Sequence, residues 1–156
     1  VIKDLHGLTV QGFVNKLKNK FSLVAVSDNP LKPSSRGEFS VYLAYKWYLF
    51  ALTERKVTGN PVQDLDVSYL SDHIFDPILG IYDQRKDERI DFVGGIRGLE
   101  ELSRRVDSGE MAVAFALFPV SMKELLQVAD AGEIMPPKST WFEPKLRSGL
   151  FVHELE

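Results

Sequence analysis

The sequence contains no cysteine. A chain without cysteine has no disulfide framework, no thiolate metal cluster and no cysteine nucleophile, and its composition suits the reducing cytoplasm. Histidine is also scarce, with 3 residues, and none of them belongs to a His-x-x-x-His or His-Glu-x-x-His pattern. We therefore expect a cytoplasmic protein without a metal site.

The chain also lacks a long hydrophobic run and an excess of positive charge. Its longest mostly apolar stretch, residues 111–118, is far shorter than the ~20 residues that span a bilayer. The 19 Lys and Arg residues stand against 22 Asp and Glu residues, a formal net charge of −3, whereas nucleic-acid interfaces need concentrated basic charge. We therefore expect a soluble protein that binds neither a membrane nor nucleic acid.

What the chain does have is length and apolar content for one core. Its 156 residues are 44% hydrophobic and 26% charged, which predicts a single α/β domain over residues 1–156. The first residue is valine, and residues 1–5 have the character of a strand. We therefore expect a carboxyl-terminal fragment of a larger protein, whose oligomeric state the sequence does not indicate.

The spacing of apolar residues predicts strands that alternate with capped helices. The predicted helices are residues 9–20, a helix that Asp64 or Asp66 caps and Pro77 stops, a helix through Leu99, Leu102 and Val106, and a helix that begins with the capping box of Ser121 and Glu124. The predicted strands are residues 1–5, 22–26, 90–93, 111–118 and 149–155, with an antiparallel hairpin over residues 38–53 that breaks near residues 44–46.

A hairpin combined with strand-helix alternation predicts an α/β sandwich, in which helices pack on a mixed sheet. A pure doubly wound fold is less favoured, because no helix separates the strands of the hairpin. Strands 90–93 and 111–118 both lead into helices, which predicts parallel neighbours. Open α/β sheets bind ligands outside the edge where the carboxyl ends of such strands meet.

Residues 136–149 form a proline-stiffened loop with the strongest chemical signal. Cations and short hydroxyls together suit a phosphate or a carboxylate. The loop lacks the glycines and the following helix of a P-loop. An alternative is a rigid connector whose Trp141 and Phe142 fill the core. The candidate ligand-binding residues of this loop are Lys138, Ser139, Thr140, Lys145 and Arg147.

Gly94 and Gly95 follow a predicted strand and precede a predicted helix, where their backbone N–H groups could bind an anion. The alternative is an ordinary glycine turn, since Glu100 and Glu101 would repel an anion. We predict that the proline loop folds back, so that Lys138 or Arg147 reaches the Gly94-Gly95 backbone in a shared cleft.

Two other segments give weaker hypotheses. Asp72, His73 and Asp76 suggest hard-metal or acid-base chemistry, although carboxylates on an outer helix face are usually only solvated. The densely charged segment 83–91 is either a solvated loop or a site in which Arg85 and Arg89 bind an anion beside Asp91. The aromatic side chains of the 38–53 hairpin form either a stacking platform or part of the core.

Four strings of this sequence resemble the carboxyl half of the bacterial proteins known as domain of unknown function 1015. These strings are the run from Met135-Pro136-Pro137-Lys138-Ser139-Thr140 to Gly149-Leu150, together with Ile2-Lys3-Asp4-Leu5, Lys46-Trp47-Tyr48, and Arg89-Ile90-Asp91-Phe92-Val93-Gly94-Gly95. Full-length members of that family carry an upstream half with an Asp-Gly-His-His-Arg string, which resembles the nucleotide-handling loop of the ParB and sulfiredoxin-like superfamily.

The resemblance implies that the missing upstream half holds ATP or ADP and is this chain's partner. Some members of the ParB and sulfiredoxin-like superfamily phosphorylate free serine, which implies a small-molecule kinase linked to serine metabolism. We predict that this chain contributes an anion-binding wall for a phosphate-bearing molecule to such an enzyme, and that the chain alone has no turnover. The alternative is a non-catalytic scaffold or partner-binding domain.

Overall fold

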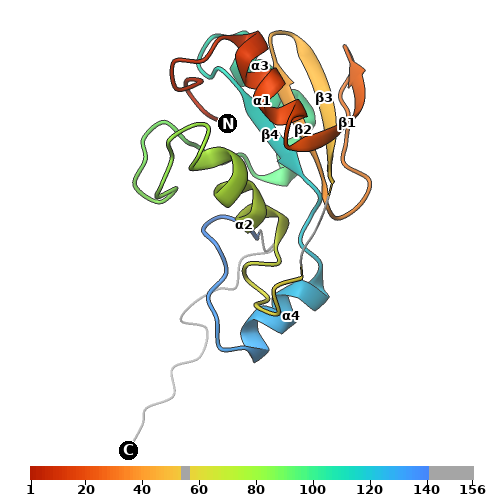
Figure 1. Ribbon diagram of the computed structural model, residues 1–156, viewed down its shortest axis with the longest axis vertical. Helices are drawn as coiled ribbons and strands as arrows, with labels where there is room; N and C mark the ends of the chain where they lie inside the picture. The colour runs from red at the N-terminus through yellow and green to blue at the C-terminus, as the bar shows by residue number, and fades with distance from the viewer. Residues whose placement is uncertain (54–56, 141–156) are drawn as a thin grey trace, which may run out of the picture.

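The computed structural model describes residues 1–53 and 57–140. These residues form a four-stranded sheet with helices packed against it (Figure 1), which confirms the predicted mixture of helices and strands. The strands are β1 (Phe21–Ser27), β2 (Glu38–Leu43), β3 (Lys46–Leu52) and β4 (Ala114–Leu117), in the spatial order β1-β3-β2-β4. The helices are α1 (Val10–Lys18), α2 (Asp66–Leu70), the π-helical turn η1 (Ser71–Phe75), the 3-10 turn η2 (Gly95–Arg97), α3 (Gly98–Asp107) and α4 (Met122–Asp130).

The β2–β3 hairpin turns within the break that the sequence predicts near residues 44–46. Leu43 pairs with Lys46, and the two residues between them, Ala44 and Tyr45, have φ angles of +50° and +62°. Two successive positive φ angles give a turn whose twist matches that of the flanking strands. The predicted hairpin is therefore confirmed, although neither turn residue is a glycine.

Side-chain caps begin two of the predicted helices. The Thr9 hydroxyl accepts a hydrogen bond from the Gly12 amide (3.1 Å) at the start of α1. At α4, the Ser121 hydroxyl accepts from the Glu124 amide (3.2 Å), while the Glu124 carboxylate accepts from the Ser121 amide (2.9 Å). Both bonds of the predicted capping box are present.

The predicted cap of α2 is wrong. The N-cap residue is Leu65, which makes no side-chain cap bond. The carboxylates of the two proposed caps bind other segments: Asp66 accepts from the Gly37 amide (2.8 Å), and Asp64 accepts from the Thr58 amide (2.8 Å). These two side chains tie loops to the body of the fold.

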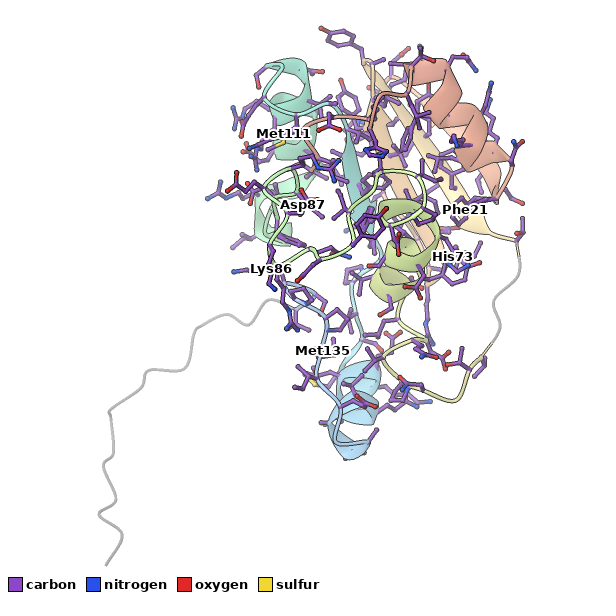
Figure 2. All side chains as sticks on the ribbon, turned by 60° about the vertical axis from the view of Figure 1, so that its left-hand side comes forward. Phe21, His73, Lys86, Asp87, Met111 and Met135 are labelled. Carbon is purple, nitrogen blue, oxygen red and sulfur yellow. The ribbon has the colours of Figure 1, made fainter. Side chains whose placement is uncertain are left out.

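Apolar side chains are buried on both faces of the sheet. Along β2, Phe39 and Val41 belong to the core under α1 and α2, while Tyr42 packs in a second core under α3. Figure 2 shows α1 and α3 on opposite sides of the strands. Trp47 of β3 is 1% exposed in the second core, so Tyr42 and Trp47 are core residues, whereas Tyr45 at the hairpin turn is 70% exposed.

The predicted parallel strand pair does not form. All three pairings in the sheet are antiparallel, and residues 90–93 contain no named strand. Ile90 makes one isolated bridge to Ile2, which also bridges Val113. The predicted strand at residues 1–5 shrinks to that bridging residue, because the Asp4 carboxylate accepts from the His6 amide (2.8 Å) and turns the chain away.

The predicted strand at residues 149–155 lies outside the described residues, as do Trp141, Phe142, Lys145 and Arg147. No helix in the described ranges has both the length and the apolar character that crossing a bilayer requires.

Candidate functional site

A pocket of about 480 Å³ lies where the chain leaves β4. Three segments line it: residues 91–95, residues 117–125 and residues 138–140. The second of these is the last residue of β4, the connection to α4 and the first turn of that helix. The third segment returns to the pocket after α4 has ended.

Five of the predicted ligand-binding residues line this pocket: Gly94, Gly95, Lys138, Ser139 and Thr140. The described part of the proline loop, residues 136–140, does fold back, and Lys138 lines the same pocket as Gly94 and Gly95. Lys145 and Arg147, the other two predicted residues, lie outside the described residues. The proximity of the two loops is thus a feature of the structure, whereas anion binding there stays a prediction.

The backbone at Gly94 and Gly95 is exposed to the pocket region. A side-chain carbon added at Gly95 would meet no atom within 4 Å. No close packing within the described residues therefore requires a glycine at this position. The carbonyl of Gly94 accepts a hydrogen bond from the Arg97 amide (3.0 Å), which closes the η2 turn before α3.

Lys138 supplies the cation of the pocket. Its side chain is exposed and has no ion pair with any described residue. Its φ angle is +56°, a left-handed conformation that is uncommon for residues other than glycine. The backbone turn at Lys138 therefore brings the next two residues to the pocket wall at some conformational cost.

The two hydroxyls beside Lys138 differ in what they can offer an anion. The Ser139 hydroxyl donates to the carbonyl oxygen of Pro136 (2.7 Å), so its hydrogen is already used. The Thr140 hydroxyl has no hydrogen bond with any described residue. Thr140 is thus the better donor of the predicted pair, and Ser139 instead fixes the shape of the loop.

Asp91 brings a negative charge to the same pocket. Its carboxylate accepts from the Arg105 guanidinium (2.6 Å) and from the Phe92 amide (2.7 Å). The hydrogen bond from Arg105 is the main reason why the pKa of Asp91 lies below its usual value. The side chain of Arg105 is only 12% exposed and also pairs with Glu110. Asp91 is therefore ionised and already has a partner.

The rest of the lining is mostly apolar. The pocket has an aliphatic and aromatic wall, to which residues 92–93, the end of β4, the connection and α4 contribute. This wall was not predicted from the sequence. The signal for it was the amphipathic pattern of α4, whose Val128 alone is fully buried. The apolar lining residues are Phe92, Val93, Leu117, Pro119, Val120, Met122 and Leu125.

The amino terminus of α4 already has a carboxylate of its own beside it. The carboxylate of Glu124 closes the capping box, and it also pairs with Arg36 (2.8 Å). An anion at this helix start would have to displace a carboxylate that the chain itself supplies. The structure therefore favours Lys138 rather than the helix terminus as the group that meets an anion.

Arg89 bonds to several groups of the chain itself. Its guanidinium pairs with Asp87 through two bonds (3.0 and 2.7 Å) and donates to the carbonyl oxygens of Leu79 (3.0 Å) and Gly80 (2.8 Å). These bonds hold the charged segment against the turn after η1. The hypothesis that Arg85 and Arg89 bind an anion beside Asp91 stays a prediction.

The Asp72, His73 and Asp76 segment forms the π-helical turn η1 and its end. The ring of His73 stacks on Tyr69 (3.9 Å between centroids), and its Nδ1 atom lies 2.9 Å from the Tyr69 carbonyl oxygen. Within residues 1–53 and 57–140, no three His, Asp or Glu side chains form a group that could hold a metal ion. His73 therefore packs on its own helix.

Residues 1–68 match the model of a family described as protein of unknown function (DUF1015). No curated protein and no solved structure matches the chain. The matched residues hold α1, the three strands β1 to β3 and the start of α2. Every residue that lines the pocket lies after the matched range, so the match bears on the sheet and not on the pocket.

Proposed function

We propose that this chain contributes an anion-binding wall, for a phosphate group or a nucleotide, to a larger enzyme. The observation that supports this proposal is the ammonium of Lys138, which has no ion pair with any residue that the structure describes, in one pocket with Thr140 and the open backbone of Gly95. A cation without a protein partner, next to hydrogen-bond donors, is the arrangement that an anionic ligand can complete.

In its finer form, the proposal makes this chain the carboxyl-terminal half of a cytoplasmic DUF1015 protein. The missing upstream half would bind ATP or ADP, and the whole protein would be a small-molecule kinase linked to serine metabolism. The match at residues 1–68 supports the link to the family. In this proposal the isolated chain has no turnover of its own, because its sequence has no cysteine and no Ser-His-Asp or metal-ligand spacing.

Calorimetry of the full-length protein with phosphate, ADP and ATP tests the anion wall. We expect Lys138→Ala to weaken binding by about tenfold or more, since a charge-assisted hydrogen bond is lost. Lys123→Ala is the matched control, because Lys123 is an exposed lysine of α4 that does not line the pocket. Equal affinity of the wild type and Lys138→Ala for all three ligands would overturn the proposal.

A second candidate function is a non-catalytic scaffold or partner-binding domain. The observation that favours it is a set of exposed apolar side chains on and after α4: Met122 is 63% exposed, Leu126 54% and Ile134 79%. Exposed apolar groups that lie together often mark a protein interface. A Leu126→Asp variant should then weaken association with a separately produced upstream half, while phosphate binding at the pocket stays unchanged.

A further inference from the structure

The described lining of the pocket has one cation, Lys138, and a larger set of apolar residues, which restricts the chemical class of a ligand more than the cation does. Phe92, Val93, Leu117, Val120 and Leu125 all line the pocket, and each of them is only partly buried. They come from two separate segments of the chain, residues 91–95 and 117–125, so the fold brings this wall together. A compact inorganic anion would leave these apolar surfaces in water.

The charges in the pocket restrict where an anionic group can lie. Asp91 is ionised and would repel an anion, and Arg105, which could compensate, is already shared between Asp91 and Glu110. Among the described lining residues, Lys138 offers a cation that has no ion pair with any described residue, and Thr140 beside it offers a hydroxyl. When the charged group of a ligand lies at this segment, the uncharged part of the ligand contacts the apolar wall.

We propose that the pocket selects an organic anion with an apolar body about the size of one ring, rather than a bare inorganic anion. The charged group lies at Lys138 and Thr140, and the apolar body packs against Phe92, Leu117 and Leu125. The volume of about 480 Å³ falls in the range of sites for small organic ligands. This inference rests on the anion wall proposed above and adds the chemical class of the ligand.

The test compares three probes on the 156-residue chain by two-dimensional NMR titration: phenyl phosphate, inorganic phosphate and benzyl alcohol. Phenyl phosphate should bind at least about tenfold more tightly than either of the other two, since it combines the charge with a buried ring. Its largest shifts should fall on residues 91–95, 117–125 and 138–140. Those shifts are read in the wild type, so this part of the test needs no variant.

Two neighbouring leucines of α4 provide a matched pair of variants. Leu125 lines the pocket, whereas Leu126 is 54% exposed and does not line it. We expect Leu125→Ala to weaken phenyl phosphate binding about three- to tenfold, the effect of losing part of an apolar contact. Leu126→Ala should bind phenyl phosphate as the wild type does.

The outcomes separate this inference from the anion wall. Inorganic phosphate that binds as tightly as phenyl phosphate, with Lys138→Ala weakening both, would overturn the selection for an apolar body and leave the anion wall standing. Phenyl phosphate binding that depends on Leu125 but not on Lys138 would overturn the anion wall instead. The absence of shifts at the pocket with all three probes would overturn both.

Discussion

The hydrogen bond between Tyr42 and Asp107 makes the sharpest prediction about stability. The hydroxyl of Tyr42 on β2 donates to the carboxylate of Asp107 (2.8 Å), the last residue of α3. Tyr42 itself is 5% exposed in the core between the sheet and α3. Replacing Tyr42 with Phe keeps the ring and removes this hydrogen bond between α3 and the sheet.

The size of the effect follows from the two partners. A hydrogen bond to a charged group contributes about 1.5 to 3 kcal/mol. Asp107 is exposed and regains water when Tyr42 is replaced, so we expect the lower end of that range. Tyr42→Phe should therefore lower the free energy of unfolding by about 1.5 kcal/mol at pH 7.

The same bond predicts how the effect depends on pH. Burial, with a further contribution from Asp107, raises the pKa of Tyr42 from 10.0 to about 12. Above pH 10 the unfolded chain loses the Tyr42 proton while the folded chain keeps it, so the stability due to Tyr42 falls as the pH rises. The advantage of the wild type over Tyr42→Phe should shrink by about 1.4 kcal/mol per pH unit in this range and be nearly gone at pH 11.

Urea denaturation of both proteins at pH 7, 10 and 11, followed by circular dichroism, measures this difference. The other tyrosines and the lysines titrate in both proteins, so the comparison cancels their effects. A Tyr42→Phe variant as stable as the wild type at pH 7 would refute the role of the bond. A stability difference that stays constant from pH 7 to pH 11 would refute the raised pKa.

Three further predictions concern local features. Ser121→Ala removes the capping box of α4 and should destabilise the chain by about 1 kcal/mol in urea, whereas an unchanged midpoint would show that this helix start contributes little. Tyr45→Gly should stabilise the chain by about 1 kcal/mol, because Tyr45 is 70% exposed and has a φ angle of +62°, which glycine adopts without strain. Arg105→Gln should move acid unfolding to higher pH, because it removes the main cause of the lowered pKa of Asp91. That lowered pKa contributes stability at pH values above the ordinary pKa of an aspartate, and this stability is lost as the pH falls through the lowered pKa. The same midpoint for both proteins, in an acid titration monitored by Trp fluorescence, would contradict a stabilising bond between Arg105 and Asp91.

Local signals explain which elements of the fold were predictable. Three predicted features depend only on neighbours within a few residues: the caps at Thr9 and Ser121 and the break of the hairpin. All three are present. The segments at residues 1–5 and 90–93 have apolar strand character as well. Whether such segments form strands depends on pairing with partners far away in the chain. Here the pairing is limited to the isolated bridges of Ile2 to Ile90 and Val113.

Gly94 and Lys138 line one pocket, as predicted, but parallel strands do not place Gly94 there. Its position was expected from the shared carboxyl edge of two parallel strands, and the sheet has no such pair. Gly94 instead lies near the end of β4 because residues 1–2 bridge both Ile90 and Val113, which holds the segment before Gly94 beside the segment before β4. The amino-terminal segment with Ile2, rather than the edge of a parallel sheet, therefore positions Gly94 at the pocket.

The length of α4 explains how the proline loop reaches the same pocket. The helix has 9 residues, which at 1.5 Å per residue carry the chain only about 14 Å away from β4. Residues 132–140 then run without a helix or strand, and at up to ~3.3 Å per residue they can cover that distance about twice. In Figure 1, α4 lies at one end of the molecule and the segment that follows it turns back toward the body. The prolines restrict the path of this segment, and Lys138 takes a left-handed conformation at its end.

An inserted turn of α4 would carry the chain only about 5 Å farther, so the spare length of residues 132–140 should let Lys138 still reach the pocket. Loss of the proposed phosphate binding in such an insertion variant, with the fold intact by circular dichroism, would show that the path is already fully extended.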